Sequence, residues 1–352
     1  MKKIGIESLH HFAVEAMCAC GMTDQDAHTV ADVLVSTDTF GVTTHGTKNL
    51  YGYAQKMQAG GLDAKAIPTV EAQGPAWAML NGNRAMGMVT ACRAMELAVD
   101  KAKSAGIAYV GVKNSCHFGA AGYYANIAAK ANMIGIVASN ADPIMAVPGG
   151  CGVSIGTNPF AYAAPTGDGK SIFLDIALSN VAALKVIMAK EKGQRLPDGC
   201  LIDQEGRPTN DPNTFPQASS LAPMGAHKGY GLAVMVEILS AVLTGANMLS
   251  QVHSWNLDMA QPNRVGHAFI AIDIGQMMPL KQFAARMTAL AEELRSAKRA
   301  KGVEQIFLPG EMEWAKREEA RARGWLSVSE AMEDSLNKLA AMCGLKLDWL
   351  MG

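Results

Sequence analysis

The sequence lacks a strong charge bias and a membrane-spanning run. Lys and Arg total 31 and Asp and Glu total 32, so the formal net charge is -1. A chain this close to neutral carries no electrostatic footprint for nucleic acid or an anionic membrane surface. The longest strongly apolar stretch, residues 229–246, contains Glu237 and several glycines, and it is too short and too polar to span a bilayer. We therefore predict neither a nucleic-acid nor a membrane partner.

A cysteine framework is missing as well. The seven cysteines are scattered along the chain, and no two of them form a CxxC pair. This pattern argues against a disulfide scaffold and favours a reducing compartment. The first residues, MKKIGIESLHHF, have no apolar run of the length that a signal peptide needs. The sequence thus predicts a cytoplasmic protein, and its 49% of hydrophobic residues suffice for a sizeable core.

Three familiar chemical signatures are absent. No GxGxxG motif follows a predicted strand, which argues against the usual dinucleotide-binding fold. Gly169-Lys-Ser171 resembles the end of a phosphate loop, but Ala164 stands where that loop requires its first glycine. There is no HExxH motif, and Cys116-His117 has no second cluster at ligand spacing, so we predict no metal site.

Apolar periodicity nevertheless predicts an α/β protein. Helices are expected at both ends of the chain, and a βαβ-like alternation is expected between them. The expected helices cover residues 6–20, a stretch capped by Thr23, 50–59, 86–104, 120–131, 229–243, 282–301, 313–323 and 327–342. The expected strands cover residues 107–113, 133–139, 160–164, 172–175 and 268–274.

Two clusters at the ends of these elements contain histidine. His45 lies between hydroxyl residues and Gly46, where a glycine admits substrate and a hydroxyl can orient the ring. It is a candidate proton donor, or else a histidine at a helix end caught in a turn. His117 follows the strand 107–113 and opens a helix, a position that suits an anion or a cofactor. The alternative is an ordinary helix start with a buried histidine.

Two further clusters lie at comparable junctions. Asp175 ends a strand and could orient a histidine, bind a ribose hydroxyl or cap a helix. His227-Lys228-Gly-Tyr-Gly231 opens the apolar helix and could contact a phosphate, although glycine-rich helix starts are also common packing devices. A proton donor, a carboxylate and a phosphate contact are together compatible with hydride transfer to a carbonyl.

With these motifs the sequence resembles the type-2 malate/L-lactate dehydrogenase family of NAD(P)-dependent oxidoreductases. The resemblance covers nearly the whole chain, and its specificity comes from the order of the motifs. These are Gly41-Val-Thr-Thr-His45-Gly46, Asn114-Ser-Cys-His117-Phe-Gly-Ala-Ala-Gly122, Gly156-Thr-Asn-Pro159, Asp175-Ile-Ala177, Pro208-Thr-Asn-Asp-Pro212, Lys228-Gly-Tyr-Gly231, Gly266-His-Ala-Phe-Ile-Ala-Ile272 and Leu308-Pro-Gly310-Glu311.

The resemblance implies a non-Rossmann mixed sheet with helices in a central domain, plus a helical domain built from both chain ends. We place the helical N-terminal part at residues 1–75, the central α/β cofactor-binding domain at 76–278 and the helical C-terminal part at 279–352. It further implies a homodimer and a small 2-oxo or 2-hydroxy acid substrate. The cofactor is expected to be NAD, with NADP possible.

The resemblance also assigns roles to residues. His45 matches the acid/base that protonates the substrate oxygen, and His117 is a second candidate, since family members differ in which histidine is credited. Asp175 matches the carboxylate that supports this acid and lies beside the nicotinamide. The stretches that match dinucleotide contacts are Asp175, Ile176 and Ala177, then His227 and Lys228, then Gly310, Glu311 and Met312.

The expected substrate site departs from the family pattern. Thr44 replaces the usual serine before the first histidine. Asn49, beside Lys48, replaces an arginine that would clamp the substrate carboxylate. We expect Thr44, Lys48 and Asn49 to contact substrate.

Two other functions are alternatives to a dehydrogenase of 2-hydroxy acids. One is a reductase of cyclic imino acids, and the other is a non-catalytic dinucleotide-binding protein.

Overall fold

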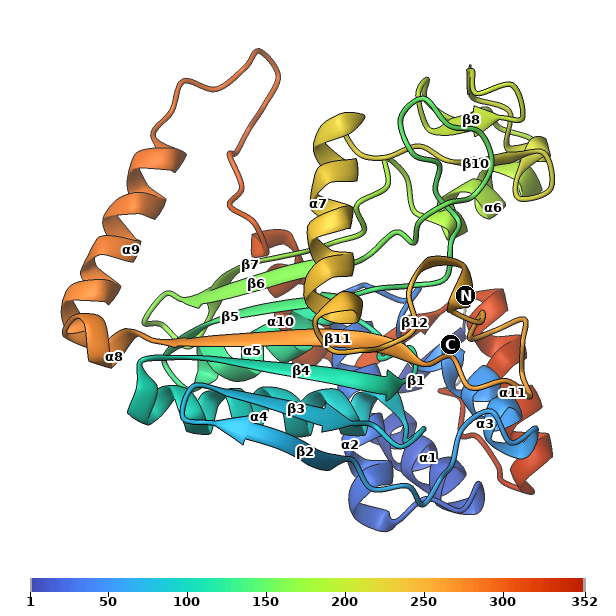
Figure 1. Ribbon diagram of the computed structural model, residues 1–352, viewed down its shortest axis with the longest axis horizontal. Helices are drawn as coiled ribbons and strands as arrows, with labels where there is room; N and C mark the ends of the chain where they lie inside the picture. The colour runs from blue at the N-terminus through green and yellow to red at the C-terminus, as the bar shows by residue number, and fades with distance from the viewer. Residues whose placement is uncertain (1, 351–352) are drawn as a thin grey trace.

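A mixed seven-stranded sheet forms the centre of the computed structural model, which describes residues 2–350 (Figure 1). Across the sheet the strands are β2 (Thr69–Gly74), β3 (Trp77–Asn81), β4 (Ile107–Ser115), β11 (Val265–Asp273), β5 (Met133–Ser139), β6 (Phe160–Pro165) and β7 (Ser171–Ile176). Only β3 and β4 pair in parallel. This order confirms the non-Rossmann mixed sheet.

The position of strand β11 determines which strand ends lie together. It comes from late in the chain, yet it lies between β4 and β5 and is antiparallel to both, with Phe269 opposite Val110 and Val137. Strand β6 separates β5 from β7 in the same way. Strands β4, β5 and β7 therefore run in one direction, and their carboxyl ends meet at one edge of the sheet.

Two helices pack on the sheet where the βαβ pattern predicted them. They are α4 (Gly87–Ala105) and α5 (Ala121–Lys130), which contact β4, β5 and β6. Helix α5 packs so close to the sheet that a Cβ on Gly135 would clash with the backbone of Ala125. The core here combines buried alanine and methionine from the helices with β-branched residues from the strands.

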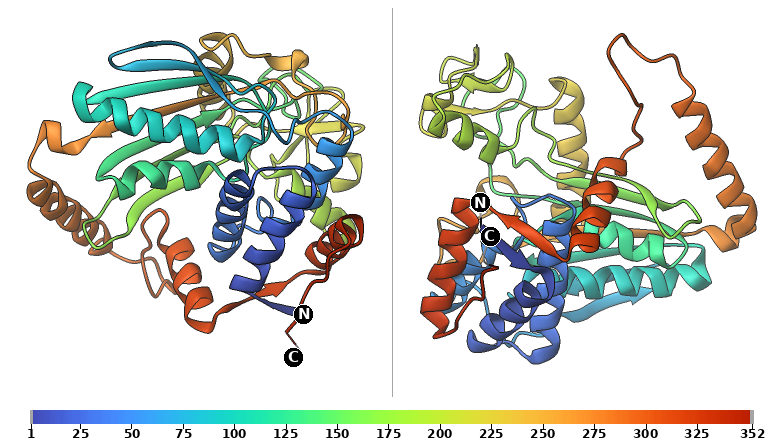
Figure 2. Two further views of the ribbon diagram at one scale, coloured as in Figure 1. Left: turned by 90° about the horizontal axis from the view of Figure 1, so that it is seen from below. Right: turned by 180° about the vertical axis from the view of Figure 1, so that it is seen from behind.

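The two chain ends build a helical part together, as predicted. The N-terminal helices are α1 (Ile6–Ala19), α2 (Asp24–Thr39) and α3 (Leu50–Gln58), and the C-terminal ones are α10 (Glu311–Arg323) and α11 (Glu330–Cys343). The Thr23 hydroxyl caps α2 by accepting from the Asp26 amide at 3.2 Å. Helix α11 packs against α1 and α3, so the blue and red ends of the chain lie together (Figure 2).

Several elements correct the sequence predictions. Strand β12 (Trp325–Val328) pairs with β1 (Lys2–Gly5), although residues 327–328 were expected in a helix. Residues 69–74 form β2, so a strand of the central sheet lies within the part predicted to be helical. Both strands depend on partners that a local pattern does not reveal. Helix α9 (Leu280–Arg295) ends six residues before the expected residue 301 and is followed by the Ser296 cap.

The segment between β7 and β11 forms a separate layer above the sheet (Figure 1). It holds α6 (Ala183–Glu191), a small sheet of β8 (Leu201–Asp203), β9 (Pro208–Thr209) and β10 (Ser219–Leu221), and α7 (His227–Glu237) with a π-helical extension, Ile238–Val242. Short α8 (Ile274–Met277) leads from β11 into α9, which projects from the body. Within residues 2–350 no helix is long and apolar enough to cross a membrane.

Candidate active site

A cavity of about 750 Å³ lies at the edge where β4, β5 and β7 end. Its wall contains His117 after β4, Asn140 and Asp142 after β5, and Asp175 at the end of β7. His45 reaches it from the loop between α2 and α3. Because the three strands run in one direction, they bring together polar side chains that are far apart in the sequence, as expected for a ligand site at strand carboxyl ends.

A buried carboxylate holds the loop that carries His45. Asp38, at the end of α2 and only 3% exposed, accepts from the Thr47 amide at 2.9 Å and from the Thr47 hydroxyl at 2.6 Å. Its other oxygen, Oδ1, has no hydrogen-bond partner and lies against Gly46, where a Cβ would overlap it. Burial raises the pKa of Asp38 to about 7 despite the Thr47 contacts and Lys48. Gly46 is therefore required for this packing.

The two predicted histidines meet in the cavity. Their rings stack with centroids 5.6 Å apart and planes 29° apart. The Thr44 hydroxyl lies 2.8 Å from His45 Nδ1, which fulfils the orienting role expected of a neighbouring hydroxyl. The Tyr53 hydroxyl lies 2.5 Å from His117 Nδ1, and Trp255 stacks on His117 with centroids 4.5 Å apart.

Burial keeps both imidazoles neutral. Desolvation, with a smaller contribution from Lys48, lowers the pKa of His45 to about 4. Desolvation, followed by His45 and His267, lowers the pKa of His117 well below its usual range. Burial raises the pKa of Tyr53, so its hydroxyl keeps its proton and can donate it to His117 Nδ1. A neutral His117 then carries its own proton on Nε2.

Asp175 lies in the same cavity but does not contact His45 as predicted. Its Oδ2 accepts from the Gly122 amide at 2.7 Å, in the first turn of α5. It thereby caps a helix from a distant strand, which Ala120 at the cap position cannot do. Burial raises its pKa to about 6, and the Gly122 contact opposes this rise. No hydrogen bond between Asp175 and His45 exists within residues 2–350, since His45 Nδ1 contacts Thr44 instead.

The predicted dinucleotide contacts divide into two groups. Ile176, Ala177, Gly310 and Met312 line the cavity beside Asp175. Glu311 does not, because its carboxylate accepts from the Leu308 amide and pairs with Arg295.

His227 and Lys228 also fall outside the cavity wall, although they do begin α7 as predicted. Both side chains are exposed at that helix end. The structure of one chain therefore does not bring them to the cavity.

The substrate contacts expected near His45 need correction too. Thr44 lines the cavity, whereas Lys48 and Asn49 do not. The Asn49 amide donates to the Thr44 carbonyl at 3.0 Å and thus braces the histidine loop. Lys185 on α6 is the one lysine or arginine of the cavity wall among the described residues.

No sequence motif indicated Tyr53 or the cavity residues Trp255, Asp142 and Lys185. Tyr53 is fully buried in α3, eight positions after His45, a spacing that carries no recognised signature. Trp255 and Asp142 come from loops, where side-chain direction depends on the fold. Lys185 follows the Asp175-Ile-Ala177 motif by eight positions, and this proximity is the one signal that could have been followed.

The chain is similar over most of its length to known dehydrogenases. A family model described as malate/L-lactate dehydrogenase matches residues 4–337. A malate dehydrogenase from Pyrococcus abyssi is 35% identical over 351 residues, covering 98% of this chain and 96% of that protein. A ureidoglycolate dehydrogenase (NAD(+)) from Escherichia coli strain K12 is 34% identical over 323 residues, with coverage of 92% and 91%.

Solved structures agree with these matches. The sulfolactate dehydrogenase of Methanocaldococcus jannaschii superposes with a TM-score of 0.91 at 32% identity, covering 98% of each chain. A delta1-piperideine-2-carboxylate reductase from Pseudomonas syringae superposes with a TM-score of 0.85 at 30% identity, covering 97% of this chain and 100% of that one.

Proposed function

The chain belongs to the malate/L-lactate dehydrogenase family, and we propose that it transfers a hydride between a nicotinamide cofactor and a small 2-hydroxy or 2-oxo acid in the cavity of His45, His117 and Asp175. The chain is thus an oxidoreductase acting on CH–OH groups. The observation that carries the site assignment is the meeting of two neutral imidazoles and a carboxyl group in one cavity.

The cavity fits a nicotinamide in size and chemistry. Its volume is in the usual range for small-molecule sites, and Phe173, Ile176 and Ala177 supply apolar wall beside the polar groups. NAD, with NADP as a second choice, would lie along Asp175–Ala177 and Gly310. When bound, the nicotinamide ring supplies the hydride acceptor or donor.

The chain's own part is proton transfer. In the direction of alcohol oxidation, neutral His45 accepts the hydroxyl proton as the substrate C–H bond breaks. In reduction the imidazolium returns this proton to the oxygen. Asp175, ionised above about pH 6, stabilises the positive charge that forms on the imidazole through the low-dielectric cavity. His117, oriented by Tyr53, provides a hydrogen-bond donor for the same oxygen.

Replacement of each histidine tests this assignment. His45→Ala should lower kcat by about 10²–10⁴-fold and leave NADH binding, followed by fluorescence, near normal. The kcat of His117→Ala, compared with that of His45→Ala, shows which histidine contributes more to turnover. His11→Ala, at an exposed histidine, is the matched control. If His45→Ala turned over at the wild-type rate, His45 would have no part in the reaction.

Lys185 is our candidate for the anionic end of the ligand, either the substrate carboxylate or the cofactor pyrophosphate. Lys185→Gln should raise KM about tenfold with a smaller change in kcat, since an ion pair that forms in both ground and transition states is lost. The matched control is Lys190→Gln, at the end of the same helix. The substrate or cofactor whose KM rises identifies the anion. If neither KM changed, Lys185 would hold no part of the ligand.

Reduction of a cyclic imino acid is a second candidate, supported by the superposition on the piperideine carboxylate reductase. The same imidazoles would then move a proton to or from nitrogen. Following absorbance at 340 nm with NADH or NADPH and a panel of oxaloacetate, pyruvate and a cyclic imine separates the two. A protein that binds NADH but reduces nothing in a broad panel would instead be a non-catalytic binder.

A homodimer in the cytoplasm completes the proposal. Helix α7 and its extension leave Leu232, Met235, Ile238, Val242 and Leu243 exposed, an apolar face that a second copy would cover. Sedimentation velocity should give a dimer, and Ile238→Glu with Val242→Glu should give monomers. A monomeric wild type would contradict this. The cytoplasmic location rests on the cysteine pattern and is tested by cell fractionation.

A further inference from the structure

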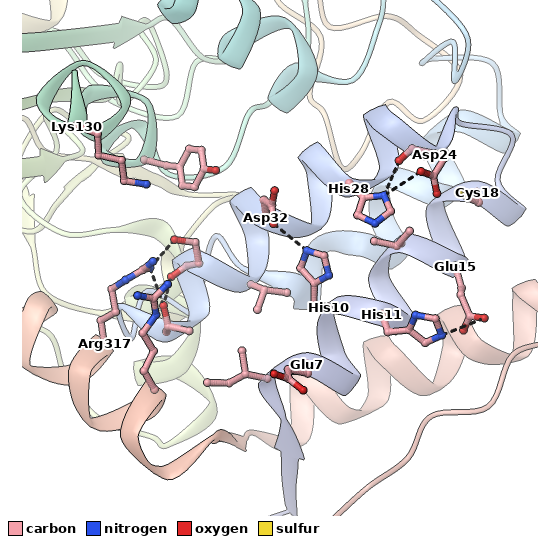
Figure 3. A pocket seen from close by; sticks show the side chains of 17 residues that line it. Glu7, His10, His11, Glu15, Cys18, Asp24, His28, Asp32, Lys130 and Arg317 are labelled. Carbon is pink, nitrogen blue, oxygen red and sulfur yellow. Dashed lines mark hydrogen bonds and ion pairs between the residues drawn. The ribbon is translucent and has the colours of Figure 1, made fainter.

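A second cavity, of about 850 Å³, lies between α1, α2, α5 and α10, outside the site described above (Figure 3). We call it the polar groove. Three histidines and four acidic residues line one part of it, and three basic residues line the other. Tyr123 belongs to the walls of both cavities, so the groove adjoins the proposed active site.

Three of the four acidic residues in the polar groove pair with its histidines. His10 Nε2 lies 2.8 Å from Asp32 Oδ1, His28 Nδ1 lies 3.4 Å from Asp24 Oδ2, and His11 Nε2 lies 3.5 Å from a Glu15 oxygen. In Figure 3 a dashed line joins the Asp32 carboxylate to His10, and none joins it to Arg317. Within residues 2–350 no carboxylate of the groove lies within 4.0 Å of the basic residues, although the charge of Asp32 opposes the fall in the pKa of Lys130.

The basic end consists of Lys130 on α5 and Arg317 and Arg321 on α10. Within residues 2–350, none of the three forms an ion pair within 4.0 Å. Other basic residues near α10 do pair, as Arg323 does with Glu319 and Lys170 with Glu318. The three cations thus repel one another at a hollow in the surface, an arrangement that an anion would stabilise.

Arg317 is fixed in a geometry that suits an anion. Its Nη1 donates to the Ser36 and Thr39 hydroxyls at 2.6 and 3.0 Å, and its guanidinium lies 4.6 Å from the Phe40 ring centroid. Its Nε is buried and has no hydrogen-bond partner. Burial and then Arg321 lower the pKa of Arg317 to about 10, and burial followed by Arg317 and Arg321 lowers that of Lys130. A bound anion would oppose both shifts.

We propose that Lys130, Arg317 and Arg321 form a binding site for a phosphate group at the basic end of the polar groove. Phosphate fits better than a monocarboxylate, because its two negative charges and tetrahedral oxygens match three converging cations, and guanidinium groups bind phosphate oxygens through paired N–H donors. The phosphate could be a free ion or a group on a nucleotide, such as the 2′-phosphate of NADP. Phe40, which contacts Arg317 and lines the proposed active site, connects the two cavities.

Titration with inorganic phosphate tests the free-ion source. Isothermal calorimetry on the whole chain, at constant ionic strength, should show saturable binding of one phosphate per chain. Lys130→Gln and Arg321→Gln should each weaken it about tenfold, the usual effect of losing one charge-assisted contact. Both side chains are exposed, so these variants should fold, whereas Arg317 packs on Phe40 and is left intact. Lys298→Gln and Arg286→Gln are the charge-matched controls.

Steady-state kinetics with both cofactors tests the nucleotide source. If the phosphate belongs to NADP, Lys130→Gln and Arg321→Gln should raise KM for NADP+ about tenfold and leave KM for NAD+ unchanged. The proposal is overturned if the wild-type protein does not bind phosphate and the variants change KM for NADP+ no more than KM for NAD+. It is also overturned if the controls weaken binding as much as the groove variants do. The calorimetric arm needs no turnover, so its result is separable from a failure of the proposed dehydrogenase activity.

Discussion

Replacing Asp38 by asparagine should remove a pH-dependent loss of stability from the loop that carries His45. The folded-state pKa of Asp38 is about 7, against an ordinary value of 3.8. At 1.36 kcal/mol for each factor of ten, this difference corresponds to about 4 kcal/mol. Burial is the largest cause, and the unpaired Oδ1 against Gly46 shows where the ionised carboxylate lacks a partner.

The direction of this pH dependence of stability follows from proton binding. Between about pH 4 and pH 7 the folded state holds a proton on Asp38 that the unfolded chain releases. The contribution of Asp38 is therefore most favourable below pH 4 and is lost as pH rises through 7. Asparagine keeps an oxygen acceptor for Thr47 and never ionises, so the variant lacks this loss.

Urea unfolding from pH 4 to pH 8 measures the effect. The unfolding free energy of Asp38→Asn minus that of the wild type should rise by about 4 kcal/mol across this range, while contributions from other titrating groups cancel. Asp100→Asn, an exposed residue paired with Lys103, should show a change below about 1 kcal/mol. Parallel pH curves for wild type and Asp38→Asn would refute the reasoning.

Three further predictions concern the cavity itself. Asp175→Asn should remove an inflection near pH 6 from the kcat/KM profile of alcohol oxidation, because activity should fall as this carboxylate is protonated; an inflection that survives would belong to another group. Gly46→Ala should destabilise the protein by about 3 kcal/mol, since its Cβ would overlap the Asp38 carboxylate, and a Tm within a degree of wild type would contradict that contact. Tyr53→Phe should lower kcat about tenfold and change Tm little, because it deletes only the hydroxyl that orients His117; an unchanged kcat in steady-state assays would exclude that role.

Local sequence determined most helices and the positions of the key side chains. The Thr23 cap, the apolar periodicity of α1 and α2 and the strand runs of β4 and β5 are contained in short contiguous segments, so each element could be predicted without its neighbours. His45, His117 and Asp175 stood out because each lies at or near the end of a regular element. The domain limits at 75/76 and 278/279 stay a prediction.

Tertiary structure alone decided what these side chains contact. Insertion of β11 between β4 and β5 brings the carboxyl ends of distant strands to one edge, and no local pattern specifies that order. For the same reason Asp175 was expected beside His45 but caps α5, and Asn49 was expected at the substrate but braces the loop. Periodicity is a property of neighbouring residues, whereas partners, burial and the pKa shifts they cause depend on residues far apart in the chain.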